Sequence, residues 1–414
     1  MSNIQDLDQL VFHYVFSDDL SLKKSIAAEI KTNAEKSGIY FASIYNFYQA
    51  FAHSEISGFT VPAINLRGMT YDFTQTIFQL INKYQIGPVI FEIARSEMEY
   101  TRQTPEEIAV VTLASALKTN YQGPIFLQGD HCQFSRKRFS EDAQKEIINL
   151  KNYLQSLIDA GFYNIDIDAS TLVDLEKSDI NEQQKNNFTM TAELTKFIRS
   201  AEKTIINIGG EIGHIGGRNS TVTDFEAFIT NYQRLISNEN IIDISKVSVQ
   251  TGTSHGGIPD AQGNLQNVNV DFNVLNNIGI AAKRYGLAGT VQHGASTLPI
   301  GLFNHFPKNH TVEIHLATGF QNTMFKYLPT NLVQKMDQWI LTNLQTKKKP
   351  EWTEQQFIYK MRKKTLGQFK KELWSLNQEN KEPVFTALNN QLEQIFSALN
   401  VFKTRNILDK YINN

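Results

Sequence analysis

The hydrophobic positions in the middle of the chain fall into eight short runs that are rich in β-branched and aromatic residues. The runs are residues 59–65, 88–94, 124–130, 163–169, 204–210, 247–253, 288–294 and 311–317. Helix-length segments separate most of them, for example residues 143–161 before the fourth run. Strands that alternate with helices are typical of a parallel sheet.

The two ends of the chain show helical spacing instead. Leu22, Ile26 and Ile30 recur four residues apart, and Gly38 supplies a stop. Residues 330–414 are rich in Lys, Glu, Gln and Leu and also favour helices. The predicted parts are a helical N-terminal extension (1–55), a barrel domain (56–325) and a helical C-terminal extension (326–414).

Two arrangements of a parallel sheet compete for the central part. Eight strand–helix units over roughly 270 residues fit a closed barrel of about 250 residues. An open doubly wound sheet would normally carry a Gly-rich phosphate loop after its first strand, and the segment INLRGMT at residues 64–70 is not one. We therefore predict an α/β fold, a (β/α)8 TIM barrel with additional helical segments.

Composition and charge exclude several classes of protein. The net charge of -2 leaves no global basic field to attract nucleic acid or anionic lipid. No uncharged stretch reads as a membrane span, and the first residues lack the basic region of a secretory signal. Cys132 is the single cysteine, which excludes an intramolecular disulfide. We expect a cytoplasmic protein.

Imidazoles and carboxylates gather at the ends of the predicted strands. In strand order these side chains are Asp130, His131, Asp168, Glu211, His255, His293 and His315. The carboxyl ends of barrel strands form one rim, where active sites lie. Such a rim suits Zn2+, which takes three protein ligands and keeps one position open. We assign His131, His255 and His293 as ligands; Glu211 is either an alternative ligand or a partner that orients an imidazole.

A hydrolytic zinc barrel of the amidohydrolase kind is a rival use of this site. It should carry a His-x-His pair after the first strand, and Asn65-Leu66-Arg67 stands there instead.

Small residues follow two of the assigned ligands. The segments are Ser254-His255-Gly256-Gly257 and His293-Gly294-Ala295-Ser296. Backbone N–H groups exposed at such positions can cradle a phosphate. The alternative is that these glycines only allow tight turns.

Together these segments resemble the class II, metal-dependent fructose-bisphosphate and tagatose-bisphosphate aldolases, over residues 59–322. The matching segments are VPAINLRG with Asn65, GDHC with Asp130 and His131, IDAS with Asp168 and Ser170, GGEIGHIGG with Glu211, TSHGG, and QHGAS. Their order along the chain agrees with the order in that family.

The resemblance implies one Zn2+ per chain, acting as a Lewis acid on the dihydroxyacetone-phosphate half of a ketose bisphosphate such as fructose 1,6-bisphosphate. Asp130 would exchange the proton of the C4 hydroxyl. A monovalent cation, Na+ or K+, would lie near a phosphate held by Gly256, Gly294 and Ser296. The resemblance also implies a glycolytic homo-oligomer, a dimer or tetramer. The other residues assigned to substrate binding are Asn65, Arg95, Asp168, Ser170, Ala295 and Thr318.

Three departures from the family pattern leave the identity of the ketose substrate undetermined. The family's strand-eight Lys-Ile-Asn is Glu313-Ile314-His315, the loop at residues 218–220 has no acid, and Ala94 stands where a phosphate-binding Ser is expected. We assign His315 to the chemistry, as a neutral donor to the enediolate or as the C3 proton carrier. The alternatives are an aldolase of the same mechanism for another phosphorylated or acidic ketose, and a non-catalytic supporting subunit. A supporting subunit would not need Asp130 and three histidines.

The basic segment at residues 360–364 has two interpretations. It is either a solvated helix face, or one of its cations reaches an active-site rim, of its own or a neighbouring subunit, and binds the second phosphate of the substrate.

Overall fold

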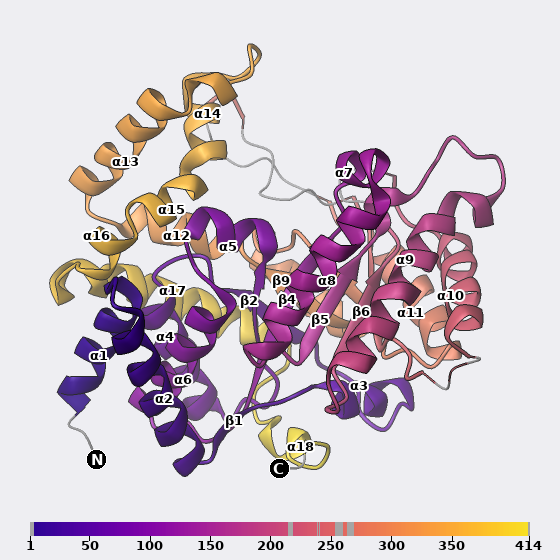
Figure 1. The fold of residues 1–414 in the computed structure, drawn as a ribbon, viewed down its shortest axis with the longest axis horizontal. Helices are drawn as coiled ribbons and strands as arrows, with labels where there is room; N and C mark the ends of the chain where they lie inside the picture. Colours follow the sequence, from indigo (N-terminus) through magenta and orange to yellow (C-terminus); the bar gives the residue numbers. More distant parts are fainter. Residues whose placement is uncertain are drawn as a thin grey trace.

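Eight parallel strands close into a barrel in the computed structural model, which describes residues 4–213, 218–237, 239, 241–252, 260–262 and 269–412 (Figure 1). The strands are β2 (Val61–Asn65), β3 (Ile90–Ala94), β4 (Gly123–Gln133), β5 (Asn164–Asp168), β6 (Asn207–Glu211), β7 (Lys246–Val249), β8 (Thr290–Gln292) and β9 (Thr311–Leu316). Pairing of β2 with β9 and of β4 with β5 closes the ring. The predicted barrel is confirmed, and an open sheet is excluded.

One further strand was not predicted. β1 (Ile39–Phe41) pairs in parallel with β4, outside the ring of eight. Three residues are too few to show a periodic pattern, so only the pairing identifies this strand.

Helices connect the barrel strands. They are α4 (Thr70–Tyr84), α5 (Arg95–Thr101), α6 (Pro105–Lys118), α7 (Arg136–Glu141), α8 (Ala143–Asp159), α9 (Ile180–Ala201), α10 (Val222–Ser237), α11 (Phe272–Arg284) and α12 (Thr318–Tyr327), with the 3-10 helices η1 (Ser170–Leu172) and η2 (Ile300–Lys308). Side chains at the first turn help to start these helices, as α6 shows. The Thr104 hydroxyl accepts a bond from the Glu107 N–H, and Pro105 takes the first position of α6, where no N–H is needed.

The N-terminal segment is helical, as predicted. α1 (Ile4–Phe16) and α2 (Leu20–Lys36) pack against α6, and α3 (Tyr45–Ala52) lies at the end of the barrel opposite α14 (Figure 1). Gly38, at φ +71°, follows the end of α2. Leu22, Ile26 and Ile30 all lie in α2, as their spacing predicted; Ile26 and Ile30 are buried, whereas Leu22 is 41% exposed.

The C-terminal segment is also helical. Its elements are α13 (Thr330–Asn343), η3 (Gln345–Lys347), α14 (Glu354–Met361), η4 (Arg362–Lys364), α15 (Thr365–Gln368), α16 (Lys370–Trp374), α17 (Gln378–Ala398) and α18 (Arg405–Leu408). α17 packs against α4 and α12, and α15 packs against α5 (Figure 1). η4 contacts α5 as well, the helix that follows β3. No helix among the described residues is long and apolar enough to cross a membrane.

The barrel interior is unusually polar. Barrel interiors are normally filled with bulky branched side chains. Here Lys246 on β7 contacts Gln128 on β4 and Glu313 on β9, and all three side chains are buried. These strands are not neighbours, so their side chains meet inside the barrel.

Candidate active site

A bulge in β4 places two consecutive side chains in the barrel mouth. Successive side chains of a strand normally face opposite sides of the sheet. The pairing of β4 with β5 shifts register between Gly129 and Cys132, and His131 has φ +42°. The bulge therefore lets Asp130 and His131 both face the site, while Cys132 is buried.

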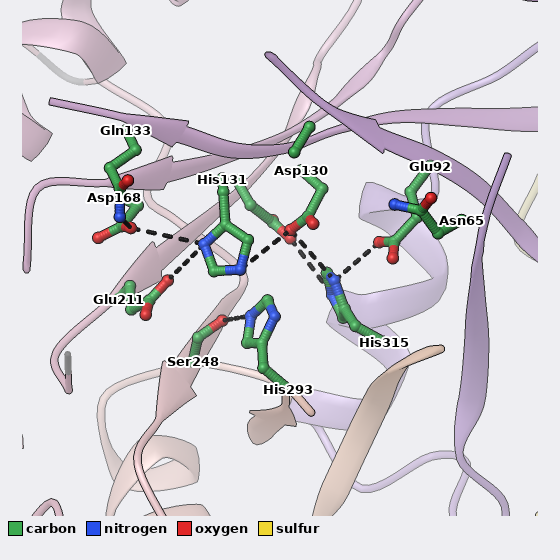
Figure 2. A network of polar contacts seen from close by, with 12 residues as sticks. Asn65, Glu92, Asp130, His131, Gln133, Asp168, Glu211, Ser248, His293 and His315 are labelled. Atoms are coloured by element: carbon green, nitrogen blue, oxygen red, sulfur yellow. Dashed lines mark hydrogen bonds and ion pairs between the residues drawn. The ribbon is translucent and has the colours of Figure 1, made fainter. Parts of the chain in front are cut away.

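Imidazole and carboxylate groups gather around His131 (Figure 2). Its Nδ1 lies 3.4 Å from Asp168 Oδ2 and 3.4 Å from Glu211 Oε2. The His293 ring centroid lies 4.3 Å from that of His131. Candidate ligand atoms of Asp130, His131 and His293 fall within 4.8 Å of one another, as do those of His131, Asp168 and Glu211. Nitrogen and carboxylate donors at this spacing suit Zn2+.

Hydrogen bonds hold the outer members of this group in place. The Ser170 hydroxyl donates to Asp168 Oδ1 at 2.6 Å, and the Gln133 amide donates to Asp168 Oδ2 at 2.5 Å. His293 Nε2 lies 3.0 Å from the Ser248 hydroxyl. Ser170 was predicted to bind substrate; the structure places it behind Asp168, outside the cavity above the barrel.

His315 lies on the other side of Asp130 (Figure 2), and four carboxylates surround its ring. Its Nδ1 is 2.7 Å from Glu92 Oε2 and 3.2 Å from Asp130 Oδ1. Its Nε2 is 2.6 Å from Glu313 Oε1 and 3.5 Å from Asp166 Oδ2.

These carboxylates oppose the neutral ring that we expected. Burial lowers the pKa of His315, but the charges of Glu92 and Asp130 outweigh burial and raise this pKa well above its usual value. The structure therefore favours the protonated ring, because a cation among anions is stabilised.

Burial and neighbouring charges give the carboxyl groups of the site different pKa values. Burial raises the pKa of Asp130, but the charges of His131 and His315 lower it well below its usual value. Burial and the Asp168 charge raise the pKa of Glu211 to about 7. Burial likewise raises the pKa of Glu92 to about 7, against the opposing effect of His315.

The predicted phosphate segment lies where β8 and β9 end. Gly294 has φ +70°, a left-handed conformation that favours glycine. The Ser296 hydroxyl accepts a 3.0 Å bond from the Gly319 N–H in the first turn of α12. Gly294, Ser296 and Thr318 line the cavity; Ala295, also predicted, is fully buried and does not.

A polar cluster borders the cavity at the end of β2. Asn65 donates to Glu97 through its amide and accepts a 2.9 Å bond from Arg67 Nε. Arg67 Nη2 lies 2.5 Å from Glu97 Oε1. Arg95 lines the same cavity, and its guanidinium lies 5.2 Å from the centroid of the Tyr153 ring.

A cavity of about 1110 Å³ joins all these groups. Its outer wall comes from the C-terminal segment and includes Trp352, Tyr359, Lys360 and Lys363. The structure thus brings two cations of the basic segment to the rim of their own chain.

Sequence reasoning missed several cavity residues. Glu92, Arg67 and Glu97 line the cavity, and Lys246 lies beneath it. For Glu92 and Lys246 a signal existed, because each is a charged residue in or beside an apolar strand. His255 and Gly256, predicted as a metal ligand and a phosphate-site residue, lie outside the described residues.

A sequence search of curated proteins finds no match. The fold is similar to a fructose-bisphosphate aldolase from Campylobacter jejuni, with 15% identity, a TM-score of 0.52 and coverage of 88% of this chain and 96% of that chain. It is also similar to the fructuronate-tagaturonate epimerase UxaE from Cohnella laeviribosi, with 10% identity, a TM-score of 0.58 and coverage of 83% and 82%. At these identities the likeness shows the fold alone.

The sequence also matches a protein family over most of the chain. Residues 45–381 match the family described as fructose-bisphosphate aldolase class-II. The match takes in all eight barrel strands and the histidines and carboxylates at their ends. The chain therefore belongs to the class II fructose-bisphosphate aldolase family.

Proposed function

We propose that this protein is a zinc-dependent aldolase that reversibly cleaves a phosphorylated ketose, such as fructose 1,6-bisphosphate, into dihydroxyacetone phosphate and an aldehyde. One observation carries the proposal: Asp130 shares a cavity with two groups of possible metal ligands that meet at His131, one with Asp130 and His293 and the other with Asp168 and Glu211. The proposal includes a cytoplasmic, glycolytic homodimer or homotetramer, which the family resemblance implies.

The donor set fits Zn2+. His131 and His293 offer nitrogen donors, and Glu211 offers a carboxylate. His255 is the third histidine of the ligand set predicted from the sequence. Bound there, Zn2+ would supply a Lewis acid that stabilises negative charge on the dihydroxyacetone-phosphate half.

Asp130 is the proposed base for the C4 hydroxyl. Its lowered pKa keeps the carboxylate ionised, so that it can accept this proton as the carbon–carbon bond breaks. The phosphate of the same half would bind at Gly294, Ser296 and Thr318, where the N-terminal turn of α12 favours an anion. A Na+ or K+ ion beside this phosphate remains part of the proposal.

A lyase assay tests the function directly. The purified protein is offered a panel of ketose mono- and bisphosphates, with and without a chelator, and the aldehyde product is measured. Chelator-sensitive cleavage of one member is expected. Cleavage that resists complete metal removal, or none across the panel, would contradict the proposal.

Replacement of His315 should separate two chemical roles. If His315 donates to the developing enediolate, His315→Asn keeps a donor and much of the activity. If His315 carries the C3 proton, the same variant loses solvent exchange at C3 of dihydroxyacetone phosphate, by about 10²–10⁴-fold. Exchange is followed by NMR and cleavage by a coupled assay. Full cleavage and exchange in His315→Ala would make this histidine a packing residue.

An acidic ketose is the second candidate substrate, because the outer cavity carries Arg67, Lys360 and Lys363. The Lys363 ammonium lies 5.7 Å from the centroid of the Tyr100 ring. Burial, and then the charge of Arg67, lower the pKa of Lys363. An anionic group on the far end of the substrate would offset both effects.

Lys363→Ala is therefore expected to raise the KM for a bisphosphate by roughly 10-fold, the loss of one charge-assisted bond, and to leave the KM for a monophosphate unchanged. Steady-state kinetics on both substrates give the comparison. Lys364→Ala is the matched control, because Lys364 lies on the same turn over the Tyr100 ring and does not line the cavity. Equal changes on both substrates would leave only the solvated-face interpretation.

A further inference from the structure

Lys246 on β7 is buried beneath the active site and bonds to side chains from three other strands. Its Nζ lies 2.9 Å from Asp166 Oδ1, 2.9 Å from Gln128 Oε1 and 2.5 Å from Glu313 Oε1. The side chains of Lys246 and Glu313 are both 0% exposed. We call Gln128, Asp166, Lys246 and Glu313 the lysine network.

The backbone makes room for this network at one glycine. Asp166 is on β5 and Lys246 is on β7, so β6 runs between them. A Cβ on Gly209 of β6 would lie 2.3 Å from Asp166 Oδ1 and 2.8 Å from Lys246 Cε. The ion pair crosses β6 because Gly209 has no side chain.

The Glu313 carboxylate is held from four sides. Oε1 accepts from Lys246, from the Gln128 amide at 2.9 Å and from His315 Nε2 at 2.6 Å. Oε2 accepts from the hydroxyl of Tyr48, which α3 inserts from the opposite end of the barrel. Three of the four donors converge on Oε1, so Lys246 and Gln128 hold against the ring the oxygen that accepts from His315.

The same contacts determine the orientation of the His315 ring. With Nε2 committed to Glu313, the Nδ1 edge faces Glu92 and Asp130. The family's Lys at position 313 would place a cation against this ring. In this chain position 313 is an acid, and the buried cation comes from β7 instead, where it pairs with both Glu313 and Asp166.

We propose that Glu313 is a positioning residue, held in place by Lys246, that fixes the His315 ring with Nδ1 toward Asp130. This inference rests on the proposed function, in which His315 touches the reacting atoms. Glu313 itself does not line the cavity and acts only through His315.

Glu313→Gln tests the proposal, because it keeps the shape of the side chain and removes its charge. We expect kcat to fall by about 10–100-fold, as when an outer partner of a functional histidine is lost, while KM changes by less than about 3-fold. Tyr48→Phe is the matched control: it removes the bond to the other Glu313 oxygen and leaves Lys246 and His315 untouched, so kcat should stay within about 3-fold of wild type.

A double-mutant cycle shows whether Glu313 acts through His315. In the His315→Ala background, Glu313→Gln should cause no further loss of kcat, because the ring it positions is absent. A full additional loss in that background would overturn the proposal, as would an unchanged kcat in the single variant.

Two further experiments test the proposal if Glu313→Gln does not fold or if no substrate is cleaved. Removal of one member of a buried ion pair strands the other charge. If Glu313→Gln does not fold, Lys246→Met combined with Glu313→Gln removes both charges and should show the same loss of kcat; wild-type kcat in this variant would overturn the proposal. NMR of 15N-labelled histidine reports the His315 ring without any turnover. A ring signal that does not move in either variant refutes positioning even if no ketose phosphate is cleaved, whereas a shifted signal with no lyase activity refutes only the proposed function.

Discussion

Asp130→Asn is expected to lower the turnover number for ketose cleavage by about 10²–10⁴-fold, the usual range when a general acid–base group is lost. The amide keeps the size and much of the hydrogen bonding of the carboxylate but cannot take the C4 hydroxyl proton. Asp130 faces this task directly, because the bulge in β4 turns it into the cavity beside His131 and His315. Steady-state kinetics of the purified variant measure the change.

Metal content is the control for this variant. The proposed ligands His131 and His293 are untouched in Asp130→Asn, so elemental analysis should find the wild-type amount of zinc. A turnover number equal to that of wild type would remove Asp130 from the proton-transfer role. A loss of zinc together with activity would assign Asp130 to the metal instead.

His293→Ala is expected to abolish both stable zinc binding and activity. Loss of an outer partner of a metal ligand costs about 10–100-fold in affinity or activity, and loss of a ligand itself should exceed this. The site is built for this imidazole, since Ser248 holds its Nε2 at 3.0 Å and its ring lies 4.3 Å from that of His131. Zinc per chain after dialysis, together with cleavage rates before and after zinc is restored, tests the expectation.

His305→Ala is the matched control, because this histidine is exposed and packs on Phe272, with ring centroids 5.0 Å apart, and does not line the cavity. It should bind zinc and turn over substrate like wild type. Full zinc content and activity in His293→Ala would show that the metal assignment at the rim is wrong.

Sequence alone determined the barrel and much of its chemistry. Strand and helix periods differ, so the eight apolar runs could be separated from the helices between them. Parallel strands in a barrel end at one rim, so position along the chain was enough to predict that Asp130, His131, Asp168, Glu211 and His293 lie near one another.

Tertiary structure alone decided features that depend on distant segments. The bulge that aims Asp130 and His131 together needs the pairing of β4 with β5. The return of Lys360 and Lys363 to the rim depends on how α15 packs against α5. A helical pattern shows which residues share a face but not what that face meets.

The same reason explains the outcome at His315. From the sequence we expected a neutral imidazole, because a nearby Zn2+ would repel the protonated form. The partners of its two nitrogens could not be inferred from the order of residues along the chain. Glu92, Asp130 and Glu313 reach His315 from different strands. The charge of a buried group depends on its neighbours in space, so only the closed barrel could show that carboxylates surround this ring.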